Sequence, residues 1–470
     1  MPPDVPDTNA AGAPVLDLSR PRRVHIVGVA GAGMSAIALV LARMGHTVSG
    51  SDIKSAAVLE RLAAAGVEVH VGNRAEYVPS DADAVVYSTA IPLRNVELVA
   101  AGERGIPVLH RSVALAALAA TRQTIAVAGS HGKTTSASML ALILRSAGWS
   151  PSFVIGGEVN EVGSNAAFGD GDWLVVEADE SDGTFLHLSP QAALVTNIEP
   201  DHLDHYGDFD TLVRAFEQFV TSVDGPTVAC ADDEVTRRIA AARPAIRTYG
   251  FADNADYRIV DEVVDDAMTC RFTLVVDDGV RTEIAVPAGV KASTNAAGAI
   301  AIALELGVEI EAAVKALAGF GGVARRFQYR GVRDGVTFID DYAHLPTEVG
   351  SAIATARQGP WRRVVVVFQP HRYTRTASIG VQFADAFTEA DALVLTDVYP
   401  AGETPIPGVS GRVILRAVLD HHPSLPVAYL PRPADLAPVP ARYARAGDLV
   451  LTLGAGDLTA MPDVWLGAPS

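Results

Sequence analysis

The sequence predicts an α/β protein in which three nucleotide-scale units follow one another along the chain. Short apolar runs alternate with amphipathic helical stretches, and this alternation restarts three times. Such a pattern is typical of parallel sheets with crossover helices. Glycine-rich turns stand between a strand and a helix at residues 28–33 and 129–135. We therefore expect three domains: a Rossmann-like N-terminal domain, a central P-loop mononucleotide-binding domain and a Rossmann-like C-terminal domain.

The length, charge and cysteine content of the chain limit the classes of protein to which it can belong. The chain has 470 residues, which corresponds to several domains at roughly 100–200 residues each. It carries 55 acidic and 37 basic side chains and a formal net charge of −18. An acidic surface repels phosphate backbones and anionic lipid, so neither nucleic acid nor membrane insertion is expected. The two cysteines, Cys230 and Cys270, exclude a disulfide scaffold and a Cys-rich zinc module, and we expect both to be buried thiols.

The chain ends and domain boundaries follow from local composition. Residues 1–20 are rich in proline and lack the basic start and apolar core of a signal peptide, so they are expected to form a disordered leader. Apolar runs fall short of the ~18 residues of a membrane-spanning helix, which favours a cytoplasmic protein. The expected domains are residues 21–121, 122–328 and 329–470.

The first unit contains an imperfect dinucleotide-binding turn. A strand at 24–27 leads into the turn at 28–33 and a helix at 34–44, and a second strand from Thr47 ends at Asp52. Ala30 occupies the position of the middle glycine, which in the dinucleotide fingerprint lets the backbone approach a pyrophosphate. A nucleotide diphosphate other than NAD suits this turn. A nicotinamide dehydrogenase and a turn without ligand remain alternatives.

The second unit contains a phosphate loop. A strand at 124–128 enters Gly129-Ser130-His131-Gly132-Lys133-Thr134-Thr135, and a helix follows that ends near Gly148. Backbone N–H groups and the helix N-terminus can surround phosphates, Lys133 can reach β/γ-phosphate oxygens and Thr134 can bind Mg²⁺. The full Walker spacing needs glycine where Val127 stands, so the motif is a shortened GxxGKT.

Polar residues follow the next two strands. The strand at 173–176 ends at Glu177, and the strand at 192–198 leads to a segment rich in His and Asp that includes His202. In open α/β sheets, ligands bind at the carboxyl ends of the strands, and carboxylate oxygens suit Mg²⁺. A solvated acidic loop and structural histidines are the alternatives.

The remaining elements complete the second unit and form the third. Runs at 271–276 and 282–286 flank Asp277-Asp278-Gly279 and predict an antiparallel hairpin, and a helix at 295–306 follows. The third unit is expected to hold strands at 337–339, 364–368, 393–396 and 449–453.

Eight motifs follow one another along almost the whole chain: HIVGVAGAGM (25–34), AGSHGKTT (128–135), EADESDGTF (177–185), TNIEPDHLDHY (196–206), GGVARRF (321–327), DDYAHLPTEV (340–349), QPHRYTRT (369–376) and DVYPAGE (397–403). In this order they resemble the motifs of the Mur ligases of bacterial cell-wall synthesis, and within that family the branch that adds L-alanine.

The resemblance implies an ATP-dependent ligase that joins L-alanine to the carboxylate of UDP-N-acetylmuramate through an acyl phosphate. It implies ATP and Mg²⁺, with two ions expected, and a monomer or homodimer. The first domain would hold the uridine diphosphate, the second ATP and the third the amino acid. A recycling ligase that takes a murein tripeptide is the nearest alternative. A folylpolyglutamate-type ligase and a regulatory nucleotide switch are more distant ones.

The resemblance also assigns roles to individual residues. Those assigned to ATP are Gly129, Ser130, His131, Gly132, Lys133, Thr134, Thr135, Asn295, Arg326 and Asp341. Those assigned to the sugar nucleotide and alanine are Ala32, Gly33, Met34, Asp52, Ser88, His371, Arg372 and Arg375. The implied metal ligands are Thr134, Glu177 and His202. The implied catalytic residues are Lys133, His202, Arg326 and His344, and either histidine could deprotonate the amine of alanine.

The chain departs from the family pattern at a few positions. Leu345 replaces the second histidine of the usual DDYGHHP, and Lys291-Ala292 replaces the frequent His-Asn that precedes Asn295. The change at Lys291-Ala292 bears on the adenine assignment, because it lies four residues before the retained Asn295. The segment from His202 to Gly225 holds no lysine, so the carbamylated lysine of some sister ligases has no candidate there, as expected for the alanine branch.

Overall fold

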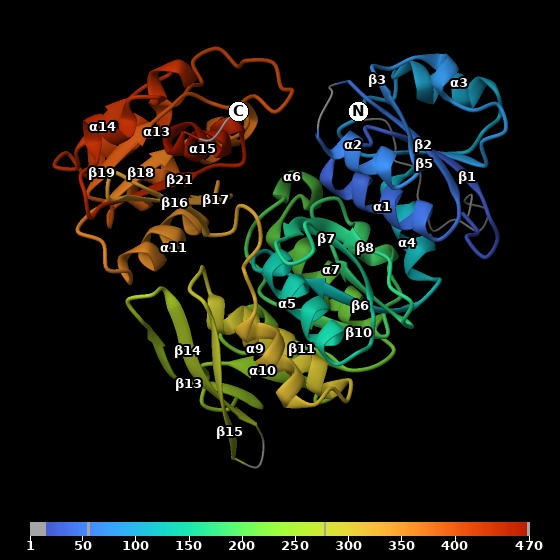
Figure 1. The fold of residues 1–470 in the computed structure, drawn as a ribbon, viewed down its shortest axis with the longest axis horizontal. Coiled ribbons are helices and arrows are strands. Elements are labelled where there is room, and N and C mark those ends of the chain that lie inside the picture. Colours follow the sequence, from blue (N-terminus) through green and yellow to red (C-terminus); the bar gives the residue numbers. More distant parts are fainter. Residues whose placement is uncertain (1–15, 54–56, 277–278, 468–470) are drawn as a thin grey trace. The chain divides into compact units, whose positions relative to one another are not determined.

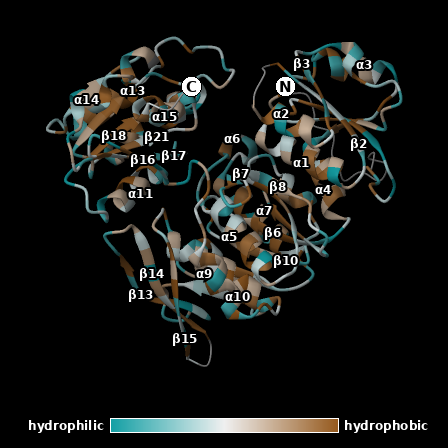
Figure 2. Cartoon of the chain, viewed as in Figure 1, coloured by the Kyte–Doolittle hydropathy of each residue, from teal (hydrophilic) through white to brown (hydrophobic). Residues whose placement is uncertain are grey.

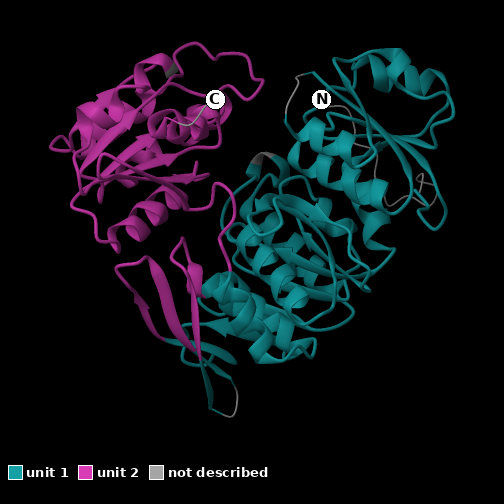
Figure 3. Ribbon diagram, in the orientation of Figure 1, with its two compact units in different colours: residues 1–260, 274–282, 294–319 teal, residues 261–273, 283–293, 320–470 magenta. Residues whose placement is uncertain are grey.

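The computed structural model describes residues 16–53, 57–276 and 279–467 (Figure 1). Most of the predicted leader and the hairpin residues Asp277 and Asp278 lie outside the described residues. The described residues form two compact units (Figure 3). Unit 1 draws on residues 1–260, 274–282 and 294–319, and unit 2 draws on residues 261–273, 283–293 and 320–470. The predicted three-domain boundaries stay predictions.

The N-terminal part of unit 1 is a parallel sheet with strand order β3-β2-β1-β4-β5. Because the order reverses beside β1, the carboxyl ends of β1 and β4 border a crevice in which α/β proteins bind ligands. The glycine turn follows β1 and Ser88 follows β4. The elements are β1 (Arg23–Val27), α1 (Ala32–Arg43), β2 (Thr47–Asp52), α2 (Ala57–Ala64), β3 (Glu68–Val71), β4 (Ala84–Tyr87), α3 (Val96–Glu103), β5 (Val108–His110) and α4 (Arg111–Ala119).

The second sheet has strand order β15-β14-β13-β12-β11-β10-β6-β9-β7-β8. β6 lies between β10 and β9 and is parallel to both, so three loops meet at one sheet edge. The elements are β6 (Gln123–Ala128), α5 (Lys133–Ser146), β7 (Ser152–Val159), β8 (Ser164–Ala167), β9 (Trp173–Glu177), β10 (Ala192–Val195), α6 (Leu203–Tyr206), α7 (Phe209–Thr221), β11 (Thr227–Cys230), α8 (Glu234–Ala241), β12 (Ile246–Gly250), β13 (Tyr257–Val264), β14 (Thr269–Val276), β15 (Val280–Pro287), α9 (Ala292–Glu305) and α10 (Ile310–Ala318).

The third sheet belongs to unit 2 and has strand order β16-β17-β21-β18-β19-β20. β16 is antiparallel to β17, and the other pairs are parallel. The elements are β16 (Gln328–Arg333), β17 (Val336–Asp341), α11 (Pro346–Arg357), β18 (Val364–Phe368), α12 (Tyr373–Ile379), β19 (Ala392–Leu395), α13 (Arg412–His421), β20 (Val427–Tyr429), α14 (Val439–Tyr443), β21 (Leu449–Leu453) and α15 (Met461–Leu466).

Apolar strands covered by helices make up the cores. β18 and β21 are buried along their whole length, and Figure 2 shows hydrophobic residues concentrated there. Continuous apolar runs are typical of strands covered on both faces. In unit 1, α7 places Phe216 and Phe219 against Phe185, and all three rings are fully buried.

The predicted α/β fold class is confirmed, with local differences in where some elements begin and end. β10 ends at Val195 rather than residue 198, because the chain turns there to bond the phosphate loop. α9 begins at Ala292, three residues before the predicted start. Cys230 and Cys270 are free and buried, as predicted. Among the described residues, we find no helix with the length and apolar character needed to cross a membrane.

We predict that Phe216→Ala lowers the free energy of unfolding of unit 1 by about 3–5 kcal/mol. The substitution removes a fully buried ring and leaves a cavity between α7 and the sheet. Urea unfolding followed by circular dichroism measures the change. Phe251→Ala is the matched control, because the Phe251 side chain is 43% exposed, and its cost should stay below about 1 kcal/mol.

Candidate active site

The phosphate loop follows β6 and depends on two glycines. Gly129 and Gly132 have φ angles of +136° and +84°, which L side chains rarely adopt. A Cβ on Gly129 would lie 2.1 Å from Thr196 Oγ1, and a Cβ on Gly132 would lie 2.4 Å from Asn295 Oδ1. The loop is thus packed between the segment after β10 and helix α9, where a larger residue would displace both neighbours.

Hydrogen bonds from the segment after β10 hold this loop in shape. Asn197 accepts from the His131 N–H with Oδ1 and donates to the His131 carbonyl with Nδ2, both at 2.9 Å. Its own carbonyl accepts from the Ser130 N–H at 2.8 Å, and Thr196 Oγ1 donates to the His131 carbonyl at 2.6 Å. Four hydrogen bonds from one short segment therefore fix the conformation of the loop.

Lys133 is held between its own loop and a carboxylate. Its Nζ donates to the Gly129 carbonyl at 2.5 Å and to Glu180 Oε1 at 2.8 Å, and lies 2.7 Å from Glu180 Oε2. The Glu180 side chain is 2% exposed and that of Lys133 is 12% exposed. A buried charge pair of this kind is stable only when both partners stay close, so Glu180 fixes the direction of Lys133.

Burial and neighbouring charges perturb both groups. Burial alone would lower the pKa of Lys133, but Glu180, Asp179 and Glu177 outweigh it and raise that pKa, so Lys133 stays charged. Burial raises the pKa of Glu180 to about 7, against the opposing attraction of Lys133. Burial would also raise the pKa of Asp179, but Arg111 and Lys133 hold it well below its usual range. Strongly perturbed groups in one cluster are typical of functional sites.

Thr134 and Glu177 form an oxygen pair beside the loop. Thr134 Oγ1 donates to Glu177 Oε1 at 3.0 Å, and the Gly156 N–H donates to Glu177 Oε2 at 2.6 Å. Hydroxyl and carboxylate oxygens are hard ligands that suit Mg²⁺, which takes one or two from protein and the rest from phosphate and water. This pair therefore fits a Mg²⁺ ion brought with a nucleotide.

His202 lies close to the same cluster. It precedes α6 with a φ of +54°, and its Nε2 is 3.3 Å from Asp201 Oδ2 and 3.9 Å from Glu180 Oε1. Within the described residues, no three His, Cys, Asp or Glu side chains are arranged to hold a metal ion unaided. His202 is thus near the phosphate loop, and its predicted role as a metal ligand stays a prediction.

The predicted sugar-nucleotide residues gather at the carboxyl end of β1. The Ala30 N–H donates to Asp52 Oδ2 at 3.1 Å, so Asp52 supports the turn in which Ala30 replaces glycine. Gly33 is in the first turn of α1, whose N-terminal N–H groups favour an anion. The Met34 side chain is buried in the core, so its backbone is the part available to a ligand.

In unit 2, Asp341 at the end of β17 supports the loop that carries Arg326. Its Oδ2 accepts from the Phe327 N–H at 2.7 Å and its Oδ1 accepts from the Ala343 N–H at 2.8 Å. Arg325 and Phe327 have left-handed φ angles, so Asp341 stabilises a strained segment. Burial raises the pKa of Asp341 to about 6, although Arg326 opposes this.

A His and Arg cluster lies at the carboxyl ends of β17, β18 and β19. The ring centroid of His371 is 5.8 Å from that of His344, and His371 stacks on Tyr399. Arg375 Nη1 lies 3.1 Å from His371 Nδ1, and Arg372 has a φ of +70° at the start of α12. The structure thus brings four of the predicted unit 2 residues into one cluster.

Three family domains match most of the chain, between residues 23 and 456. Residues 23–123 match the Mur ligase family catalytic domain, residues 127–303 the Mur ligase middle domain, and residues 325–456 the Mur ligase glutamate ligase domain. The chain belongs to the Mur ligase family. The three domains correspond to the three sheets, each with a candidate site at its strand ends.

Relatives of this Mur ligase are similar over nearly their whole length. A UDP-N-acetylmuramate–L-alanine ligase of Anaeromyxobacter sp. (strain Fw109-5) is 44% identical over 456 residues, covering 96% of this chain and 98% of the relative. One of Renibacterium salmoninarum is 46% identical over 445 residues, covering 93% and 94%.

Solved structures agree with this. A UDP-N-acetylmuramate-alanine ligase from Thermotoga maritima matches with a TM-score of 0.80 and 28% identity, covering 95% of this chain and 98% of the other. A murein peptide ligase from Psychrobacter arcticus 273-4 matches with a TM-score of 0.70 and 25% identity, with the same coverage.

Sequence reasoning missed several residues of the Mur ligase site. Glu180, the partner of Lys133, lies in the acidic segment from which the sequence singled out only Glu177, as a metal ligand at the end of a strand. Arg111 precedes that segment by more than sixty residues and had no local signal. Asn197 and Tyr399 stand in recognised motifs, yet their contacts depend on neighbouring strands.

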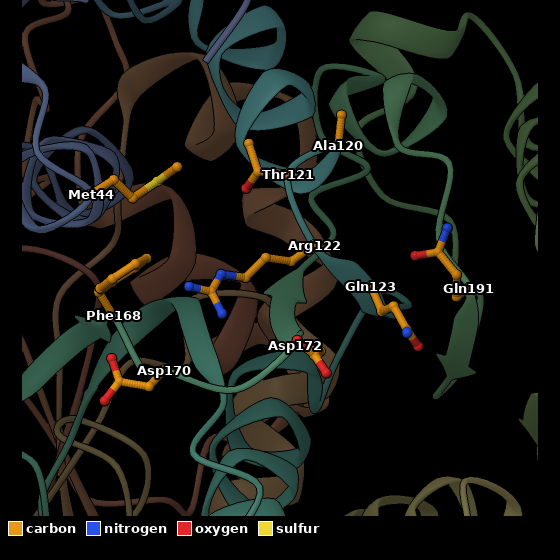
Figure 4. Close-up of a pocket in the computed structure, with 9 residues that line it drawn as sticks. All are labelled: Met44, Ala120, Thr121, Arg122, Gln123, Phe168, Asp170, Asp172 and Gln191. Atoms are coloured by element: carbon orange, nitrogen blue, oxygen red, sulfur yellow. The ribbon is translucent and has the colours of Figure 1, made fainter. Parts of the chain in front are cut away.

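A surface hollow of about 850 Å³ in unit 1 lies away from the phosphate loop (Figure 4). It borders the amino ends of β6 and β9, whereas the phosphate loop follows the carboxyl end of β6. The Arg122 guanidinium lies 4.6 Å from the Phe168 ring centre there. Its lining residues are Met44, Ala120, Thr121, Arg122, Gln123, Phe168, Asp170, Asp172 and Gln191. The hollow is therefore not the predicted nucleotide site.

We predict that His371 makes unit 2 less stable in mild acid. Burial, His344, Arg375 and Arg372 lower the pKa of His371 from 6.5 to about 3. Between these values the unfolded chain binds more protons, so the free energy of unfolding falls as pH falls. Urea unfolding at pH 7, 6 and 5 should show a smaller decrease for His371→Gln than for the native chain. His421→Gln, at an exposed position, should keep the native dependence. Equal decreases in all three proteins would refute the prediction.

Proposed function

We propose that this Mur ligase joins L-alanine to the carboxylate of UDP-N-acetylmuramate at the expense of ATP, in peptidoglycan precursor synthesis. The observation that carries the proposal is the 44% identity, over 96% of the chain, to a relative with that named activity. The preformed phosphate loop with a charged Lys133 supports the use of ATP.

In the first proposed step, a carboxylate oxygen of the muramoyl group attacks the γ-phosphorus of ATP. The bond to the β,γ-bridging oxygen breaks, and ADP and an acyl phosphate form. Catalysis of phosphoryl transfer is mainly positioning and charge stabilisation. Lys133 would hold β/γ-phosphate oxygens, the loop N–H groups would surround the phosphates and Arg326 would add positive charge to the γ-phosphate. Asn295, which contacts Gly132, would approach the adenine side.

Mg²⁺ would be held by Thr134 and Glu177, whose oxygens fit it. A bound Mg²⁺ would neutralise phosphate charge and orient the γ-phosphate. His202 is the proposed protein ligand for a second ion. Asp341 would contribute to the nucleotide site by holding the Arg326 loop.

In the second proposed step, the neutral amine of alanine attacks the acyl carbonyl, phosphate leaves and the amine loses a proton. Arg372 and Arg375 would bind the alanine carboxylate and the muramoyl carboxylate. His371 has a lowered pKa, so its ring is neutral at pH 7. Its Nδ1 can then accept a hydrogen bond from Arg375. Burial also lowers the pKa of His344, so a neutral His344 can accept the proton of the amine. His202 is the alternative proton acceptor.

The uridine diphosphate is proposed to lie at the carboxyl end of β1, against Ala32, Gly33 and Met34, with Asp52 and Ser88 nearby. We place the reaction in the cytoplasm, where ATP and nucleotide sugars are found. The proposed partners are small molecules, and the protein acts as a monomer or homodimer. The similarity to a murein peptide ligase makes a tripeptide acceptor the second candidate, which the lower identity supports less well.

Phosphate release tests this function. The native protein with Mg-ATP and UDP-N-acetylmuramate is supplied with each of the common amino acids or with the murein tripeptide. We expect release that requires both the sugar nucleotide and L-alanine. Release that requires the tripeptide would assign the protein to the second candidate. Slow release indifferent to both substrates would refute a ligase.

Lys133→Ala should reduce this turnover by on the order of 10²–10³-fold or more, because it removes the cation at the transferred phosphate. Binding of UDP-N-acetylmuramate should change little, because that site lies on another sheet. Calorimetry and phosphate release measure the two effects. Lys315→Ala, on an exposed part of α10, is the matched control and should behave as native. Equal loss of sugar-nucleotide binding would contradict the assignment of the two sites.

A further inference from the structure

Arg111 connects the glycine turn of β1 with the acidic loop beside Lys133. It is the first residue of α4, and its side chain is 22% exposed. Nη2 donates to Asp179 at 2.6 Å and to Asp182 at 2.8 Å, and Nε donates to Asp182 at 3.2 Å. On its other side, a Cβ atom on Gly33 would lie 3.5 Å from Nη1. One guanidinium group therefore faces both segments.

The planar guanidinium can serve both sides at once. It has five N–H donors in a rigid fork, and the aspartates are bonded by Nε and Nη2. Nη1 is the nitrogen nearest the first turn of α1, which contains no acidic residue and presents the positive end of its helix. A diphosphate at that turn can accept from Nη1 while Arg111 keeps both aspartates.

The acidic loop that contains Asp179 and Asp182 also contacts the phosphate loop, through Glu180 and Lys133. Asp179 is followed directly by Glu180, whose carboxylate bonds Lys133. The Tyr206 hydroxyl donates to the Glu180 carbonyl at 2.6 Å, and the Ser181 N–H donates to Asp179 Oδ1 at 3.0 Å. With backbone and side chains held in this way, a shift of Asp179 is transmitted to Glu180.

We infer that Arg111 is a positioning residue that couples occupation of the sugar-nucleotide site to the binding of ATP phosphates at Lys133. The inference rests on the proposed function. A diphosphate bound at Nη1 adds a further hydrogen bond to a guanidinium that already bonds Asp179 and Asp182, and the loop, held more firmly in this way, keeps Glu180 and Lys133 in place. The second ligand then meets groups that the first has already ordered, so the two ligands strengthen each other's binding.

Calorimetry on the full-length protein measures this coupling. The Kd of a non-hydrolysable ATP analogue with Mg²⁺ is determined with and without saturating UDP-N-acetylmuramate, and the reverse titration is also made. For the native protein we expect the second ligand to tighten binding about 5-fold or more, by the same factor in both directions. Arg111→Met should bring this factor to about 1 and weaken sugar-nucleotide binding.

A double variant separates coupling from simple binding of the diphosphate. Asp179→Asn with Asp182→Asn keeps the shape of both side chains and removes the charges that hold Arg111. Its coupling factor should also fall to about 1. Arg104→Met is the matched control and should keep the native factor, because Arg104 donates to the carbonyls of Val78 and Ala75 in the same sheet domain. If Arg111→Met does not fold, Arg111→Lys replaces it as the test variant, because lysine keeps the positive charge but lacks the forked N–H donors of the guanidinium.

Several outcomes would overturn the inference. A native factor of 1 with normal turnover would refute coupling and leave the proposed function intact. A native factor retained by the Asp179 and Asp182 double variant would show that Arg111 acts, if at all, by binding the diphosphate alone. Failure of the native protein to bind UDP-N-acetylmuramate would refute both the inference and the proposed function.

Discussion

The contact between Lys133 and Glu180 is the interaction around which the nucleotide site is organised. The phosphate loop follows β6, and Lys133 is the first residue of α5 after that loop. Glu180 belongs to the segment after β9. Their pairing is possible because β6 and β9 are adjacent and parallel, so that both strands end at the same edge. The buried carboxylate keeps the ammonium group charged and directed. The segment after β10, the other neighbour of β6, supplies Asn197, which holds the loop itself. A pre-organised cation of this kind needs little rearrangement when phosphates arrive.

Charge is distributed unevenly in this protein. The chain as a whole is strongly acidic, yet the proposed substrates are anions. Cations are therefore concentrated at strand ends: Lys133 and Arg111 in unit 1, and Arg326, Arg372 and Arg375 in unit 2. In unit 1 the acidic segment 177–182 surrounds its cations closely, which holds them in place and also limits the net attraction for anions. Mg²⁺ held by Thr134 and Glu177 would relieve that limit when a nucleotide binds.

Some of the residues with strained backbone coincide with predicted site residues or flank them. Left-handed φ angles occur at His202 and Arg372, which are predicted site residues. They also occur at Arg325 and Phe327, which flank the predicted site residue Arg326. Such conformations persist when the surroundings compensate for them. Asp341 does so for the Arg326 loop through two backbone hydrogen bonds, and the Tyr399 carbonyl accepts from the Arg372 N–H at 2.8 Å. The sites are thus built from conformations that local sequence preference alone would disfavour.

The sequence by itself determined the fold class, because alternation of strands and helices is a local pattern that sheet packing preserves. It also determined the phosphate loop, since Gly129, Gly132 and Lys133 are adjacent in the chain and their conformational demands are local. The eight ordered motifs determined the family. Only the tertiary structure decided the partners of these residues. Glu180 bonds Lys133, Asp341 supports the Arg326 loop, and Arg111 at the start of α4 bonds Asp179. The physical reason is that these contacts join strand ends far apart in sequence, and strand order, which no local pattern encodes, sets which ends meet.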